Sequence, residues 1–234
     1  MTDQKQNTIG LVIYPDMTQL DMAGPLQVFT SMPDTRVLLI WKSLEPVVSN
    51  GGLTVLPTTT FEECPQVDVL CVPGGAFGQV EMMQDPDMME FLQKQSQTAE
   101  YITSVCTGSL IVAAAGLLWG YKATSHWAFR EQLALMAAEV STERVVVDRN
   151  RITGGGVTAG IDFGLTIAGM LCGEETAKFI ELMLEYNPVP PFGVGSPEKA
   201  GLDLVETVKT VGAQLLGASL TASQQAAARL SIQA

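Results

Sequence analysis

Histidine and positive charge are both scarce in this chain of 234 residues. The single histidine is His126, and 13 basic residues stand against 25 acidic ones, which gives a formal net charge of −12. Nucleic-acid binding depends largely on cationic side chains that neutralise phosphates, so this balance argues against a nucleic-acid partner. An anionic membrane surface would repel the chain for the same reason.

Long apolar runs and paired cysteines are missing as well. No run reaches the eighteen or so apolar residues of a membrane span, and residues 1–7 are polar, without the apolar core of a signal peptide. We therefore expect a cytoplasmic protein. The four cysteines form no CxxC pair and lie far in sequence from His126, so we expect neither a metal site nor a disulfide framework; they are Cys64, Cys71, Cys106 and Cys172.

The remaining sequence alternates between strand-like and helix-like segments. The pattern predicts strands at 8–14, 36–42, 67–72 and 101–105, hairpins at 47–56 and 144–153, and helices at 22–32, 87–98, 107–118, 126–137 and 158–171. This order favours an α/β fold, with a mostly parallel sheet sandwiched by helices and ligands bound beyond the carboxyl ends of the strands. We expect one domain over 1–234, with 198–234 as a helical extension packed on it.

Cys106 stands where a predicted strand, 101–105, passes directly into a predicted helix. Such a strand–nucleophile–helix elbow presents its side chain at the top of the sheet. The N–H groups at the helix start would lower the pKa of the thiol and favour the reactive thiolate. The alternative is a small buried residue at a tight turn, which is how we interpret the other three cysteines.

Two glycine-rich segments follow other predicted strands. Gly74 and Gly75 could direct N–H groups at a ligand and form an anion pocket with the N–H of Thr107; the alternative is a plain turn. The triplet 154–156 lacks the lysine and the spacing of a phosphate loop. There we expect Gly155 to bring the backbone close to the substrate and Val157 to line the pocket.

Asp21 and His126 are the candidates for moving protons beside Cys106. Asp21 follows the first strand, and a carboxyl near a thiolate would have a raised pKa suited to general acid–base catalysis. It could instead only cap a helix that begins at Met22. His126 could form a Cys–His pair with the nucleophile, or it could be a wall of the cleft or a core residue.

Five segments together resemble a known family: LDMAGP, VPGGAFG, SVCTGSLIVAAAGLL, ATSHWA and ITGGGVTAGIDF. The pattern, which spans about 8–186, is similar to the ThiJ/PfpI branch of the class I glutamine-amidotransferase-like superfamily, and within it to the isocyanide hydratases. PfpI-type proteases carry histidine directly after the cysteine, where this chain has Thr107, and many relatives carry glutamate in place of Asp21. A further branch adds an AraC-type DNA-binding unit, for which we expect the 37 residues after Pro197 to be too few.

The resemblance implies a flavodoxin-like fold, a homodimer and a cofactor-independent lyase. Cys106 would attack the terminal carbon of an isocyanide, R–N≡C, while Asp21 supplies a proton, and the resulting thioimidate would be hydrolysed to a formamide. The residues implied to position substrate and water are Thr107, Gly74, Gly75 and Gly155, with Val157 and His126 along the pocket. Two alternatives stay open: a cysteine enzyme acting on α-oxoaldehydes or their adducts, and a cysteine-oxidation sensor.

Overall fold

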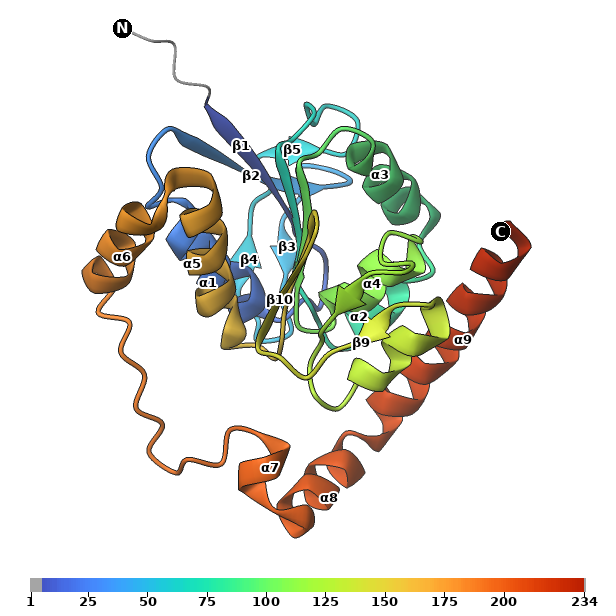
Figure 1. Cartoon of the computed structure of the whole chain (residues 1–234). Coiled ribbons are helices and arrows are strands. Elements are labelled where there is room, and N and C mark those ends of the chain that lie inside the picture. The colour runs from blue at the N-terminus through green and yellow to red at the C-terminus, as the bar shows by residue number, and fades with distance from the viewer. Residues whose placement is uncertain (1–5, 234) are drawn as a thin grey trace, which may run out of the picture.

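A seven-stranded sheet forms the centre of the molecule in the computed structural model, which describes residues 6–233 (Figure 1). Residues 1–7, in which no signal peptide is predicted, therefore lie mostly outside the described residues. The strand order is β10-β11-β7-β6-β1-β2-β5. All neighbouring pairs are parallel except β10 with β11. The predicted mostly parallel sheet is thus confirmed.

The strands of this sheet fall close to the predicted segments. Their bounds are β1 (Asn7–Val12), β2 (Thr35–Trp41), β5 (Thr59–Thr60), β6 (Val69–Val72), β7 (Tyr101–Val105), β10 (Val145–Asp148) and β11 (Arg151–Gly154). The predicted hairpin at 47–56 is the antiparallel pair β3 (Val47–Val48) and β4 (Thr54–Val55). Strands of two residues, such as β5 and the pair β8 (Lys122–Ala123) and β9 (Glu139–Val140), were not predicted, because so short a segment shows no periodicity.

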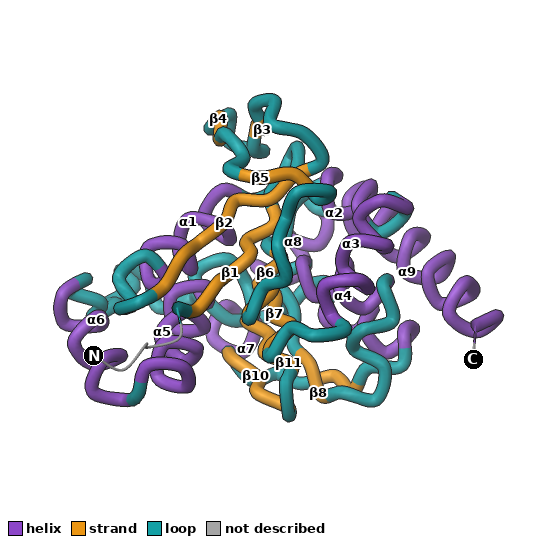
Figure 2. Tube along the Cα trace, turned by 90° about the horizontal axis from the view of Figure 1, so that it is seen from above, coloured by secondary structure: helices purple, strands orange, loops and turns teal. Residues whose placement is uncertain are grey.

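Helices cover both faces of the sheet (Figures 1 and 2). One face carries α1 (Gln19–Phe29), α5 (Ala159–Cys172) and α6 (Glu174–Met183). The other carries α2 (Phe77–Met82), α3 (Pro86–Ser96), α4 (Gly108–Ala114), the 3₁₀ helix η1 (Arg130–Met136) and α9 (Ala213–Gln233). Strands covered on both sides bury apolar residues continuously, which is why β6 is buried at all four positions.

Several predicted helices differ from those in the structure. The segment 126–137 contains η1 in place of an amphipathic α-helix, and α2 and α6 were not predicted. The helix predicted at 107–118 ends at Ala114, before Gly116 at φ 79°. The helical region predicted from 198 divides into α7 (Pro197–Ala200), α8 (Leu202–Val211) and α9, with Gly201 at φ 80° between the first two. Glycine reaches this left-handed region at little cost and often ends a helix there.

The last helix, α9, packs on the main body through both polar and apolar contacts. Ser219 and Ser223 donate hydrogen bonds to the side-chain oxygen of Gln132 in η1, at 2.8 and 3.0 Å. Arg229 donates to the carbonyl oxygen of Met83 at 2.8 Å, and Ala226 is fully buried. Among the helices of residues 6–233, α9 included, none is long and apolar enough to cross a membrane.

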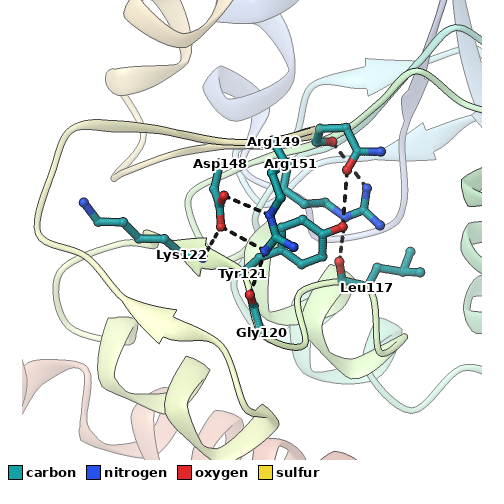
Figure 3. Close-up of polar contacts among 8 residues, drawn as sticks. Leu117, Gly120, Tyr121, Lys122, Asp148, Arg149 and Arg151 are labelled. Carbon is teal, nitrogen blue, oxygen red and sulfur yellow. Dashed lines mark hydrogen bonds and ion pairs between the residues drawn. The ribbon is translucent and has the colours of Figure 1, made fainter.

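An aromatic and cationic cluster anchors the turn between β10 and β11 (Figure 3). The guanidinium of Arg149 lies 3.6 Å from the ring centre of Tyr121, and that of Arg151 lies 4.6 Å from it. Arg149 also donates to Gly120 O at 2.7 Å, and Arg151 to Leu117 O at 2.6 Å. Arg151 pairs with Ile102 near the start of β7, so the cluster lies at the amino edge of the sheet, opposite Cys106. From this edge β11 runs parallel to β7, in the register that brings Gly154 opposite Val105.

Candidate active site

Four polar or glycine-rich segments meet at the carboxyl edge of the sheet. They follow the adjacent strands β11, β7, β6 and β1, and carry Gly155, Cys106, Gly74 and Asp21 respectively. Because these strands are parallel, their carboxyl ends lie at the same edge. The structure therefore brings together the nucleophile, the carboxyl group and both glycine segments predicted from the sequence.

Cys106 occupies a strained turn between β7 and α4. Its φ is 57°, a left-handed value that is uncommon for non-glycine residues, although five others among residues 6–233 share it. Its N–H lies 3.0 and 2.9 Å from the carbonyl oxygens of Gly154 and Gly155, and its own carbonyl accepts from Ser125 Oγ at 2.9 Å. A side chain at Gly108 would overlap the carbonyl oxygen of Val72, so glycine is required for α4 to begin this close to β6. Together these contacts hold the nucleophile elbow in one conformation.

The sulfur of Cys106 is buried against a carboxyl group. Burial, and then the charge of Asp21, raise the pKa of the Cys106 thiol well above its usual value. The backbone N–H groups of Thr107 and Val157, which are hydrogen-bonded to the sulfur, have the opposite effect and lower the pKa of the thiol. The net shift is thus opposite to the lowering predicted from the helix start, because burial outweighs the two N–H groups. A thiolate forms here only when another group takes the proton.

Asp21 is the group placed to take it. The side chain is fully buried, and burial raises the pKa of its carboxyl from 3.8 to about 7. Hydrogen bonds with the Cys106 thiol and the Gly74 N–H pull this pKa back down. Oδ2 accepts from Gly74 N at 3.1 Å, whereas Oδ1 is buried and meets no N–H or O–H donor. When Oδ1 is protonated, it can donate a hydrogen bond. The carboxyl of Asp21 and the thiol of Cys106 therefore form a pair that can share a proton near neutral pH.

The alternative role of Asp21 as a helix cap does not match the geometry. Helix α1 begins at Gln19, earlier than predicted, with Thr18 in the N-cap position. Asp21 therefore lies within the first turn, and its side chain reaches across to Gly74. Its burial beside a thiol is the arrangement expected of an acid–base group.

Gly74 and Gly75 contact the side chains of Asp21 and Thr107 and do not form the predicted anion pocket. The N–H of Gly74 is taken by Asp21, and the N–H of Gly75 donates to Thr107 Oγ1 at 3.0 Å. The same hydroxyl donates to Gly75 O at 3.1 Å. A Cβ on Gly74 would lie 2.6 Å from Asp21 Oδ2 and 2.7 Å from Thr107 N. These glycines thus allow the close approach of Asp21 and Thr107, and their N–H groups are not free for a ligand.

His126 lines the cavity near the turn of Cys106. Burial, and then the charge of Arg130, lower the pKa of His126 to about 4, so the ring is neutral at pH 7. Its Nδ1 accepts from Ala128 N at 3.3 Å, and a Cβ on Gly156 would lie 2.9 Å from its Cδ2. His126 does not contribute to the pKa shift of Cys106, whereas Asp21 does. Of the two candidates, the geometry therefore pairs Asp21 with the nucleophile.

A cavity of about 340 Å³ adjoins the turn that carries Cys106, although Cys106, Asp21 and Thr107 are not among the residues that line it. Ser125, Gly155 and Val157 each contact Cys106 and also line this cavity, as does His126. Ser125 was not singled out from the sequence. Its only signal was a pair of hydroxyl residues, Thr124 and Ser125, directly after a short strand. Within residues 6–233, no group of three or more His, Cys, Asp or Glu side chains could hold a metal ion.

We expect iodoacetamide at pH 8 to alkylate Cys106 before the other cysteines, because Asp21 can accept its proton within the site. All four cysteines are free thiols, and burial raises the pKa of each of them, to about 11 for Cys64 and about 12 for Cys71. Cys106 differs from the other three in its hydrogen bond with a carboxyl group, that of Asp21. The rate at Cys106 should rise as the pH rises through about 7, where Asp21 loses its proton. Peptide mass spectrometry measures each site. Asp21→Asn should slow labelling at Cys106 alone; equal rates at Cys106 and Cys64 in the unmodified chain would contradict the pairing.

Residues 7–170 match the model of the DJ-1/PfpI family. The chain is 48% identical over 224 residues to an isonitrile hydratase of Pseudomonas putida, covering 96% of this chain and 98% of that protein. It is also 30% identical to the HTH-type transcriptional regulator GbdR of Pseudomonas aeruginosa. That match covers 80% of this chain and 53% of the regulator.

Solved structures show the same fold. A ThiJ/PfpI family protein from Pseudomonas syringae superposes with a TM-score of 0.91 at 42% identity, covering 94% of this chain and 91% of that one. DJ-1beta of Drosophila melanogaster superposes with a TM-score of 0.71 at 23% identity, covering 77% of this chain and 98% of that one. The second likeness concerns the fold alone. Both agree with a mostly parallel sheet flanked by helices.

Proposed function

The chain belongs to the DJ-1/PfpI family, and from this premise we propose that it is an isonitrile hydratase, a cofactor-independent lyase that adds water to R–N≡C. Isonitrile and isocyanide are two names for this group. The observation that carries the proposal is the buried pair of Cys106 and Asp21, in which a thiol and a carboxyl, both of raised pKa, are hydrogen-bonded to each other. The 48% identity to the isonitrile hydratase of Pseudomonas putida supports the same activity.

The first half-reaction forms a covalent thioimidate on Cys106. The terminal carbon of an isonitrile accepts a nucleophile and a proton at the same atom. As Asp21 takes the thiol proton, the sulfur bonds to this carbon, and Asp21 passes the proton to it. The product is R–N=CH–S–Cys106, and no redox change occurs. The N–H groups of Thr107 and Val157, which stabilise negative charge on the sulfur, act until the bond forms.

The second half-reaction consumes one water. Asp21, again ionised, takes a proton from the water while the oxygen of the water attacks the thioimidate carbon. The nitrogen gains a proton, the C–S bond breaks, and the formamide R–NH–CHO leaves. The second water proton returns to the Cys106–Asp21 pair, so the enzyme regains its first state. One buried group of pKa about 7 can serve as acid and then as base, because either form is accessible near neutral pH.

Thr107, Gly74, Gly75 and Gly155 are proposed to act by positioning. Gly155 accepts the N–H of Cys106, and Thr107 ties the nucleophile turn to Gly75. Val157 and His126 are proposed to face the substrate, since both line the cavity beside Cys106. No step above uses a metal or an organic cofactor.

A direct assay tests the proposed activity. Purified protein is incubated with cyclohexyl isonitrile, the loss of its absorbance is followed, and the N-substituted formamide is identified by mass spectrometry. We expect one formamide for each isonitrile consumed. A parallel incubation with methylglyoxal tests the alternative that the protein is a cysteine enzyme acting on α-oxoaldehydes. Turnover of methylglyoxal without any formamide from the isonitrile would overturn the proposal in favour of that alternative.

The homodimer and the cytoplasmic location implied at the outset stay predictions. Exposed apolar side chains near the carboxyl end of the chain support self-association: Phe179 and Leu182 on α6 are 66% and 81% exposed, and Leu202 on α8 is 87% exposed. Large apolar surfaces of this kind often mark an interface. The proposed single domain over 1–234, with 198–234 packed on it, is supported by the contacts of α9 with Gln132 and Met83.

A further inference from the structure

The cavity beside Cys106 contains a cation with no bonded partner. Arg130, the first residue of η1, lines this cavity of about 340 Å³. Within residues 6–233, no hydrogen bond and no ion pair reaches its side chain, and its Nε is shielded from solvent. The Nε–H of this half-buried side chain has lost its water without gaining an acceptor, which is uncommon for a guanidinium. In a chain with a net charge of −12, such a cation needs an explanation.

The other charged residues of the cavity are held by their own partners. Arg144 lies 2.7 Å from Asp162, and Glu143 lies 2.8 Å from Lys122. Glu198 is at the exposed start of α7, where its carboxylate accepts from its own backbone N–H and from Ser196. The charge of Arg130 lowers the pKa of Glu198 slightly, yet the two form no ion pair. Arg130 is therefore the one charge of this lining that is left for a ligand among the described residues.

A second buried polar group in the same cavity is also without a partner. Thr124 is 1% exposed, and its hydroxyl makes no hydrogen bond, while its N–H is taken by Thr153 Oγ1. Buried hydroxyls are normally hydrogen-bonded, so an unpartnered one that lines a cavity is free to bind a ligand atom there. Arg130 offers donors only, and Thr124 can donate as well. The group that suits both is therefore an acceptor, and beside a guanidinium an anionic one.

We propose that Arg130 and Thr124 bind a carboxylate on the substrate, so that this site prefers isonitriles whose R group ends in a carboxylate over neutral ones. The inference rests on the proposed isonitrile hydration and adds the chemical class of the R group. Ser125, Gly155 and Val157 connect the two ends of the site, because they touch Cys106 and line the same cavity as Arg130. The isonitrile carbon lies at Cys106, and the carboxylate lies at Arg130.

The experiment compares each acid with its neutral ester. Isocyanoacetate, 3-isocyanopropionate and 4-isocyanobutyrate are assayed beside their methyl esters, and the ratio of kcat/KM for acid over ester is the readout. The unmodified enzyme is expected to prefer the acid at one chain length at least. Arg130→Gln should lower that ratio about 10- to 100-fold, the range of a charge-assisted hydrogen bond. Arg130→Lys, which keeps the charge without the planar fork, should restore part of it.

Two further variants serve as controls. Glu198→Gln removes a competing carboxylate near Arg130, so it should raise the acid-to-ester ratio a few-fold. Arg149→Gln removes an arginine at the opposite edge of the sheet, ion-paired with Asp148 and stacked on Tyr121 (Figure 3), and should leave the ratio unchanged. If Arg149→Gln lowered the acid-to-ester ratio as much as Arg130→Gln does, the effect would be due to overall charge and the proposal would be overturned.

A binding measurement separates this inference from the proposed function. Calorimetry follows the anionic formamides, N-formylglycine and its longer analogues, on Cys106→Ala with and without Arg130→Gln. Hydration of the esters with an acid-to-ester ratio that does not depend on Arg130 would overturn the carboxylate proposal and leave the hydratase standing. If neither acids nor esters are hydrated, the hydratase fails. In that case, binding of an anionic formamide that weakens at least tenfold in Arg130→Gln still supports the carboxylate site, and binding that does not weaken overturns it.

Discussion

Cys106→Ala is expected to abolish isonitrile hydration, with a loss of at least ~10⁴-fold, because the sulfur forms the covalent bond on which both half-reactions depend. Cys106→Ser should fail as well. A serine hydroxyl is far less acidic than a thiol, and the buried carboxyl of Asp21, with its pKa of about 7, is too weak a base to ionise it. The rate of formamide release by each variant is measured against the buffer alone.

Both variants should fold. Cys106 is small, and the cost of its positive φ of 57° is similar for cysteine, alanine and serine, so the free energy of unfolding should change by no more than about 1 kcal/mol. Cys64→Ala and Cys172→Ala are matched controls, since these partly buried cysteines lie outside the site, and both should keep full activity. Formamide production by Cys106→Ala above the buffer rate would exclude the covalent route.

Asp21→Asn is expected to lower kcat/KM at least ~10²-fold, the low end of the effect of general acid–base catalysis. Asparagine keeps the shape and can still accept from the Gly74 N–H, but it cannot take the proton of Cys106. His126→Gln should cost less than about tenfold, because the pKa of His126 is lowered to about 4 and the ring is already neutral. If His126→Gln were inactive and Asp21→Asn nearly unchanged, the acid–base assignment would be wrong.

The pH profile gives a second test of Asp21. The active form of the Cys106–Asp21 pair holds one proton. Below pH about 7 the carboxyl is also protonated and cannot act as a base, so kcat/KM should fall about tenfold for each pH unit. At high pH the second proton leaves, the acid is lost, and the rate should fall again. Asp21→Asn should lose the acidic limb of this profile, whereas a merely structural role for Asp21 would leave the limb in place.

The stability of Asp21→Asn separates a catalytic loss from misfolding. The folded-state pKa of Asp21, about 7, lies above its ordinary 3.8, so between these values the folded chain holds more protons than the unfolded one. The stabilisation from protonated Asp21 is complete below pH about 4 and is lost as the pH rises through 7, up to ~4 kcal/mol for a shift of this size. The asparagine variant lacks this loss. Urea unfolding at pH 5 and pH 8 should therefore show that the free energy of unfolding of the variant rises relative to that of the unmodified chain as the pH rises.

The strands, the helices and the turn at Cys106 could be predicted from the sequence, because each leaves a pattern in residues that are consecutive in the chain. The alternation of strand-like and helix-like segments predicted a parallel sheet covered on both faces, and the strand at 101–105 matches β7 residue for residue. The turn at Cys106 was predicted because a strand passes directly into a helix around it. These patterns are local, since burial on both faces and the start of a helix each leave their mark on consecutive residues.

The contacts of the sulfur came from the tertiary structure. In the sequence both Asp21 and His126 were candidates, and the position of Asp21 after the first strand and the family resemblance favoured Asp21. The strand order supports that choice, because it places the end of β1 one strand away from β7, across β6. The same packing assigned the N–H groups of Gly74 and Gly75 to Asp21 and Thr107. It also reversed the predicted shift in the pKa of Cys106. Burial and charge at a site are summed over segments distant in the chain, so neighbouring residues alone do not reveal them.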